Sequence, residues 1–116
     1  MTIQRIEAGP RMSQAVILNG AVYVAGQVAL ESPGASVAEQ TRTVLSRIDR
    51  LLAAAGSDKT RLVQATIWLS EIATFNEMNE VWDAWVAPGC TPARATVEAR
   101  LAAPQFTVEI AVVAGL

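Results

Sequence analysis

The sequence predicts a single α+β domain in which a mixed β-sheet carries two helices on one face. Several segments alternate with the period of two that is typical of half-buried strands, and two longer segments have the apolar spacing of helices. Their order along the 116 residues is β-β-β-α-β-α-β-β, and this length provides one core, so residues 1–116 form one domain. The sheet face without helices then needs another cover, which favours subunit contacts.

Three strands are expected at the beginning of the chain. Ile3–Ala8 alternates and is ended by Gly9-Pro10. Ala15–Leu18 and Ala21–Ala25 flank Asn19-Gly20, and this dipeptide between apolar runs is a strong hairpin signal because both residues tolerate positive φ.

The first helix is expected to begin at Ser36, after a loop over residues 31–35. Ser36 and Glu39 have the spacing of a capping box, and Gly56 is a plausible C-terminal stop. Between these ends the apolar residues form a helical stripe, which consists of Val37, Val44, Leu45, Ile48, Leu51, Leu52 and Ala55.

A fourth strand is expected over Leu62–Leu69. Its apolar side consists of Val63, Ala65, Ile67 and Leu69. Trp68 falls on the other side, which makes it a candidate for a subunit contact or a cleft wall.

The second helix is expected to open with another capping box, Thr74 with Glu77, and to end at Pro88-Gly89. Its apolar stripe consists of Phe75, Met78, Val81, Trp82, Trp85 and Val86. The two tryptophans continue this stripe, so core and interface positions are the simplest interpretation for them.

The last quarter of the chain holds two alternating runs, and each carries one ionisable residue of special interest. Arg94 shares a face with Thr96 in the first run, and Glu109 lies opposite the apolar face of the second. A half-buried charge is costly unless it is paired or used, so Arg94 and Glu109 are the leading candidates for function.

Composition favours an oligomer and argues against two kinds of partner. Hydrophobic residues make up 52% of the chain and charged residues 17%, which leaves little charged surface for a small monomer. No apolar run approaches the roughly 20 residues of a membrane helix, so a large apolar subunit interface is the better explanation. The net charge of −2 and the lack of a basic run argue against nucleic acid as a partner.

The chain has no histidine and one cysteine, Cys90. The absence of histidine excludes Ser–His and Cys–His nucleophiles and His-based zinc sites. Cys90 cannot form an internal disulfide, and MTIQRIEAGP has no apolar signal core. Both observations favour a reducing, cytoplasmic setting.

Segments along almost the whole chain carry a resemblance to a known family. They are Gly9-Pro10 with Ser13-Gln14-Ala15, Ala25-Gly26-Gln27, residues 39–56, ATIWL, residues 75–85, Pro92-Ala93-Arg94 and Val108-Glu109-Ile110. In this order and spacing they resemble the RidA (YjgF) family. Within that family, MNEVWDAWV and the ending VEIAVVAGL are most similar to the YoaB branch.

The resemblance implies a chorismate-mutase-like fold, and a homotrimer whose sheets form a central β-barrel with a ligand cleft at each interface. It also implies hydrolysis of reactive enamines and imines, such as 2-aminoacrylate, to 2-oxoacids and ammonia without metal or organic cofactor. In that scheme Arg94 holds the substrate carboxylate and Glu109 orients or activates the attacking water. Thr96, Asn79, Ala25 and Gly26 match positions near the ligand.

Four departures from the family pattern keep a second hypothesis open, a non-catalytic trimer that binds a small carboxylate or a partner protein. No Tyr follows Gly9-Pro10, and Arg11 stands near that place, either as an exposed loop charge or as a second anion-binding group. Ala25 replaces a common Ser, Thr96 a common Cys and Ala111 a common Glu. A third hypothesis, endoribonuclease, is disfavoured by the acidic balance and the lack of histidine.

Each of these residues also has a purely structural interpretation. Glu109 is either a catalytic group or the ion-pair partner of Arg94 or of an arginine across an interface. Thr96 is either a ligand donor or a residue chosen for β-propensity, and Asn79 is either a polar contact or solvent-exposed. For Cys90, the lack of an activating histidine argues against a nucleophilic role.

Overall fold

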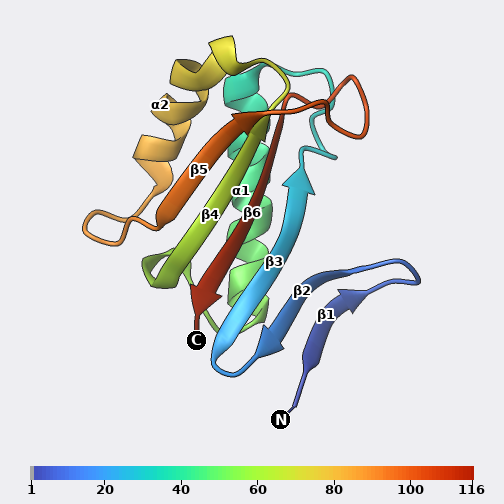
Figure 1. Ribbon diagram of the computed structural model, residues 1–116, viewed down its shortest axis with the longest axis vertical. Coiled ribbons are helices and arrows are strands. Elements are labelled where there is room, and N and C mark those ends of the chain that lie inside the picture. The colour runs from blue at the N-terminus through green and yellow to red at the C-terminus, as the bar shows by residue number, and fades with distance from the viewer. Residues whose placement is uncertain (1) are drawn as a thin grey trace.

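The computed structural model describes residues 2–116 and contains one six-stranded mixed sheet with two α-helices (Figure 1). The elements are β1 (Gln4–Ala8), β2 (Ser13–Leu18), β3 (Ala21–Val28), α1 (Val37–Ala54), η1 (Lys59–Arg61), β4 (Leu62–Leu69), η2 (Ile72–Thr74), α2 (Phe75–Trp85), β5 (Ala93–Glu98) and β6 (Val108–Gly115). This order confirms the α+β prediction.

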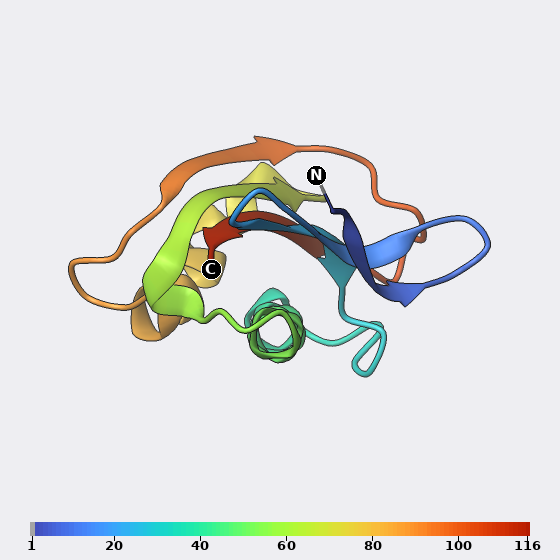
Figure 2. The same cartoon turned by 90° about the horizontal axis from the view of Figure 1, so that it is seen from below.

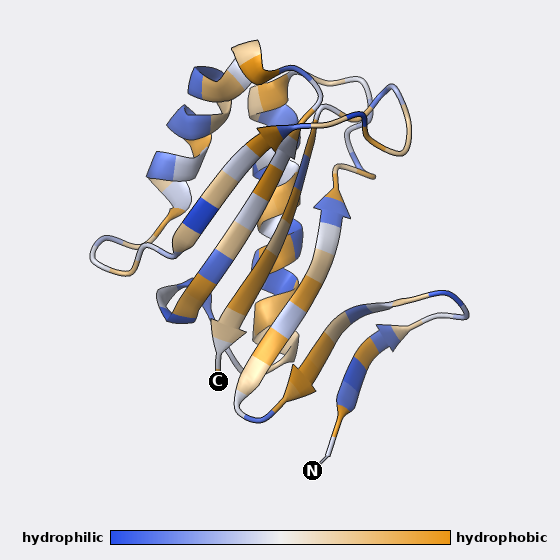
Figure 3. Ribbon diagram, in the orientation of Figure 1, coloured by the Kyte–Doolittle hydropathy of each residue, from blue (hydrophilic) through white to orange (hydrophobic). Residues whose placement is uncertain are grey.

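The strands lie in the order β1-β2-β3-β6-β4-β5. The β4–β5 pair is parallel, and every other neighbouring pair of this sheet is antiparallel. Strand β6 is therefore central and hydrophobic over most of its length, whereas β5 lies at an edge (Figure 3).

Both helices lie on the same side of the sheet (Figure 2). The α1 stripe packs on the strand residues that point to this side, and Ile48 and Ile67 are fully buried there. Each buried aliphatic side chain of this size contributes roughly 1.5–3 kcal/mol, so this interface is the main source of stability.

The opposite side of the sheet, called here the helix-free face, is largely apolar. The strand registers place Tyr23, Trp68, Val97 and Val113 on it, and Tyr23 and Val97 are 47% and 45% exposed. An exposed apolar sheet face of this kind agrees with the expectation of a subunit interface, which stays a prediction.

The start and end of α1 are as expected. The Ser36 Oγ accepts a hydrogen bond from the Glu39 amide at 3.2 Å, and Gly56 follows the helix with φ +82°. Such a conformation favours glycine and lets the chain leave the helix.

The second capping box, Thr74 with Glu77, was wrong. Thr74 belongs to the short 3₁₀ helix η2 that runs directly into α2, and its hydroxyl donates to the Glu71 carbonyl at 2.7 Å. The Glu77 carboxylate instead accepts from the Ala38 amide at 2.9 Å, so it satisfies a free N–H group at the start of α1.

The apolar side predicted for the fourth strand was wrong at one residue, Val63, which is 57% exposed. The β4–β6 register shifts between Leu62 and Gln64, so Leu62 takes the buried position at the start of the strand. A bulge changes the alternation locally, and Ala65, Ile67 and Leu69 are buried as predicted.

Within residues 2–116, none of the helices is long and apolar enough to cross a membrane.

Candidate active site

Arg94 lies on edge strand β5 under helix α2, at the wall of an open cleft of about 690 Å³. Its Nη1 donates to Asn79 Oδ1 at 2.8 Å. The guanidinium carbon lies 5.3 Å from the Trp82 ring centroid and 5.8 Å from that of Phe75. The aromatic rings and the amide hold the guanidinium at the cleft wall by cation–π contact and one hydrogen bond.

The charge of Arg94 has no directly bonded counterion among residues 2–116, because the ion pairs found there join Arg47 with Glu31 and Arg50 with Glu7. Desolvation by burial lowers the pKa of Arg94, and the nearby negative charge of Asp83 opposes this shift. An arginine stays protonated at neutral pH, so the cleft presents a cation whose remaining N–H donors suit a carboxylate.

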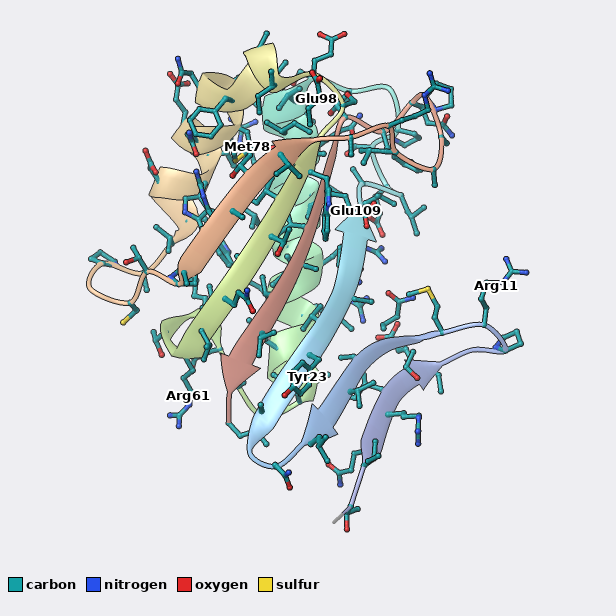
Figure 4. All side chains as sticks on the ribbon, in the orientation of Figure 1. Arg11, Tyr23, Arg61, Met78, Glu98 and Glu109 are labelled. Atoms are coloured by element: carbon teal, nitrogen blue, oxygen red, sulfur yellow. The ribbon has the colours of Figure 1, made fainter. Side chains whose placement is uncertain are left out.

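Glu109 lies on β6, beside Trp68 of β4 and Val28 of β3 (Figure 4). Desolvation by burial raises the pKa of its carboxyl group. A raised pKa brings a carboxyl closer to the range in which it can exchange a proton at working pH.

The lack of a side chain at Gly26 leaves the space that the Glu109 carboxylate occupies. A Cβ atom at Gly26 would lie 2.1 Å from Glu109 Oε2 and 3.0 Å from its Cδ, so the carboxylate occupies the space that a side chain would take. Ala25 and Gly26 together form a bulge, since Val24 pairs with Val112 and the next pair is Gln27 with Ile110.

Arg94 and Glu109 lie on opposite faces of the sheet. Arg94 pairs with Ala65, which is buried under the helices, whereas Glu109 pairs with Trp68 on the helix-free face. Strand β4 lies between them. An ion pair of these two residues within one chain is thereby excluded, and one chain does not bring both to the same ligand.

The other predicted site residues divide between these two places. Asn79 is the hydrogen-bond partner of Arg94, so its polar contact is confirmed, and Ala25 lies beside Gly26 on the bulge. Thr96 shares the face of Arg94, but its Oγ1 is buried without a hydrogen-bond partner in residues 2–116. Arg11 is exposed in the turn between β1 and β2, remote from Glu109 (Figure 4).

Sequence reasoning missed that Phe75 and Trp82 flank Arg94. The helical stripe marked both as apolar contacts, but the spacing within one helix does not tell which strand residue lies beneath it. Trp68 was expected on the side of its strand opposite Ala65 and Ile67, and its pairing with Glu109 on the helix-free face confirms that side.

The whole chain also matches known proteins. The family model described as Endoribonuclease L-PSP matches residues 2–116. The chain superposes on a crystal structure of a member of the YjgF protein family from Neisseria meningitidis with a TM-score of 0.95 and 49% identity, covering 99% of this chain and 95% of that one.

Two named relatives place the chain within that group. It is 43% identical to the RutC family protein YoaB of Escherichia coli over 116 residues, which is 100% of both chains. It is 32% identical over 108 residues to the 2-iminobutanoate/2-iminopropanoate deaminase of Rattus norvegicus, covering 88% of this chain and 77% of that one. The matches to the family model and to YoaB include both Arg94 and Glu109, and the chain belongs to the RidA (YjgF, L-PSP) family.

Proposed function

We propose that this protein is an enamine/imine deaminase that hydrolyses reactive 2-imino acids, such as the imine form of 2-aminoacrylate, to 2-oxoacids and ammonia. The observation that carries the proposal is the Arg94 guanidinium at the wall of an open cleft, oriented by Asn79 and two aromatic rings. A planar guanidinium that keeps donors available is the side chain best suited to bind a carboxylate by two parallel hydrogen bonds.

The proposed reaction needs positioning and one mobile proton. Water adds to the carbon of the C=N bond while Glu109 takes its proton, and Glu109 then passes this proton to the nitrogen, which gives a neutral carbinolamine. The hydroxyl proton moves through Glu109 to the amine, the C–N bond breaks, and the 2-oxoacid and ammonia leave with Glu109 again a carboxylate. The imine is itself electrophilic, so proximity and general acid–base help suffice without a metal, an organic cofactor or a nucleophilic side chain.

In this proposal a complete site takes Arg94 from one copy and Glu109 from another. The two residues face opposite sides of one sheet, so a single copy presents only half of the chemistry to any ligand. The apolar helix-free face around Glu109 is the surface that a second copy would cover, and a homotrimer is the expected assembly.

The relatives support the same chemistry. The similar rat protein is named for deamination of 2-iminobutanoate and 2-iminopropanoate, which are small imines with a carboxylate. The family description names an endoribonuclease, but a net charge of −2 and the lack of histidine in this chain argue against RNA as its substrate.

The first test is 2-oxoacid release from freshly generated imino acids of several side-chain sizes. We expect wild type to exceed the spontaneous rate and Arg94→Ala to lose the acceleration, while Arg100→Ala, an exposed arginine beyond the end of β5, keeps it. Glu109→Gln should abolish turnover and still bind carboxylate. No acceleration by wild type with any imine would refute the proposal.

The shared site is tested by mixing the two inactive variants. In a trimer assembled at random from equal amounts of Arg94→Ala and Glu109→Gln chains, about one quarter of the interfaces combine an intact Arg94 with an intact Glu109. We therefore expect about one quarter of wild-type activity to return. Continued inactivity of verified mixed trimers would show that the two residues do not act together across an interface.

The alternative function is a non-catalytic trimer that binds a small carboxylate or a partner protein. Ala25 in place of a common serine, and the burial of the Thr96 hydroxyl, remove polar groups from the vicinity of the ligand and favour this alternative. Carboxylate binding that depends on Arg94 without any turnover would distinguish it from the deaminase.

A further inference from the structure

Gln27 is a buried polar side chain next to the bulge that seats Glu109. It is 1% exposed, and its carboxamide nitrogen donates to Gln14 Oε1 and to the Ala25 carbonyl, both at 2.9 Å. Its carboxamide oxygen accepts from Arg47 Nε at 3.0 Å. Both of its N–H donors and its acceptor are thus engaged at once.

Arg47 connects this glutamine to helix α1. Its side chain is 15% exposed, and its Nη1 forms an ion pair with Glu31 at 2.6 Å. The guanidinium is therefore fixed on two sides, by Glu31 and by Gln27, so Gln27 is held from the helix as well as from its own strand.

The bulge is the part of β3 that most needs such support. Two residues, Ala25 and Gly26, stand there opposite one residue of β6, so the regular ladder is interrupted. The bond from Gln27 to the Ala25 carbonyl supplies a local contact where the ladder does not. Because the Glu109 carboxylate lies against Gly26, the shape of this bulge sets the place of the carboxylate.

We infer that Gln27 is a positioning residue for Glu109: its carboxamide, held by Arg47, fixes the peptide of Ala25 and with it the glycine surface on which the carboxylate rests. The inference deepens the proposed function and rests on it for the effect on turnover. Gln27 itself faces the helices and touches no ligand, so its action is through the backbone.

The test compares Gln27→Met with wild type, because methionine has a similar length and volume but cannot bond to the Ala25 carbonyl. Ser57→Ala is the matched control: the Ser57 hydroxyl donates to the Gly115 carbonyl at 2.5 Å, at the other end of β6 from Glu109. Both variants remove a largely buried side-chain bond to the backbone, so both lower the denaturant midpoint.

Two readouts separate positioning from mere stability. One is the pKa of the Glu109 carboxyl, measured by ¹³C NMR on the free protein, and the other is the separate effect on kcat and KM for an imino acid. We expect Gln27→Met to move that pKa and to lower kcat about tenfold with little change in KM, whereas Ser57→Ala moves neither. Arg47→Met, which leaves Gln27 in place, should show the same changes more weakly.

The result that overturns the inference is a folded Gln27→Met protein whose Glu109 pKa and kcat equal those of Ser57→Ala. If Gln27→Met does not fold, an Arg47→Met protein with the wild-type pKa and kcat overturns it equally. The NMR measurement needs no turnover, so it still tests positioning if wild type proves to have no deaminase activity, an outcome that would refute only the proposed function.

Discussion

Replacing Gly26 with alanine displaces one carboxylate without removing any functional group. The new Cβ would lie 2.1 Å from Glu109 Oε2 and 3.2 Å from its Cγ. An ordinary contact is about 3.4–4 Å, so the carboxylate oxygen must move by more than about 1 Å. The backbone itself tolerates alanine, because Gly26 is not among the glycines with positive φ.

A shift of this size matters more for catalysis than for folding. A misplacement of about 1 Å can reduce a rate roughly 100-fold, which corresponds to about 2.7 kcal/mol of transition-state stabilisation. We expect Gly26→Ala to lower kcat/KM for an imino acid by this order, with a much smaller effect on unfolding because the far end of a glutamate side chain can move.

Gly115→Ala is the matched control, since it also adds a methyl group to a strand and its Cβ would come no closer than 3.9 Å to another atom. The reasoning is refuted if Gly26→Ala is as active as Gly115→Ala. That result would mean that the position of the Glu109 carboxylate against Gly26 does not matter for turnover.

The remaining predictions concern the pH response, the arginine clamp and the core. Burial raises the pKa of Glu109 above its ordinary value of 4.5. At pH values between 4.5 and that raised pKa, the folded chain therefore binds more protons than the unfolded chain. The free energy of unfolding therefore falls as pH rises through that window, and urea titrations should show this decrease in wild type but not in Glu109→Gln. Asn79→Ala removes the hydrogen bond to Arg94 and should raise KM about tenfold with little change in kcat. The control is Asn76→Ala, one turn earlier at the same cleft, which should leave KM unchanged. Equal effects of the two variants would contradict the role of Asn79 in orienting Arg94. Ile67→Ala should lower the unfolding free energy by about 2–5 kcal/mol, whereas Val63→Thr at an exposed position should change it by no more than about 0.5 kcal/mol. A large loss for Val63→Thr would contradict the register shift that exposes Val63 in β4.

The sequence was sufficient for the order of elements and for the two charged candidates, because alternation and helical spacing are local signals. It was not sufficient to place Arg94 and Glu109 relative to each other in the sheet. Alternation tells which residues of one strand share a face, but Arg94 and Glu109 are on different strands with β4 between them, and only the strand order shows that they face opposite sides.

Other differences have the same origin in contacts between distant parts of the chain. Glu77 has the spacing of a cap for its own helix, yet it bonds to Ala38 of α1, 39 residues away in the sequence. Gln27 and Arg47 are joined across strand and helix, and no local pattern marks such a pair. The bulge at Ala25-Gly26 was signalled only by a glycine inside a strand.

The two strands that carry the candidate residues differ in how firmly the sheet holds them. Strand β6 is hydrogen-bonded on both sides and buried at every second residue, whereas β5 lies at the edge with most of its residues exposed. In an isolated chain, β5 should therefore open at a lower free energy than β6, and amide hydrogens around Arg94 should exchange sooner than those around Glu109. The capacity to hold a carboxylate would then be lost on mild heating while the core remains folded, and assembly with a second copy would raise the temperature at which that loss occurs.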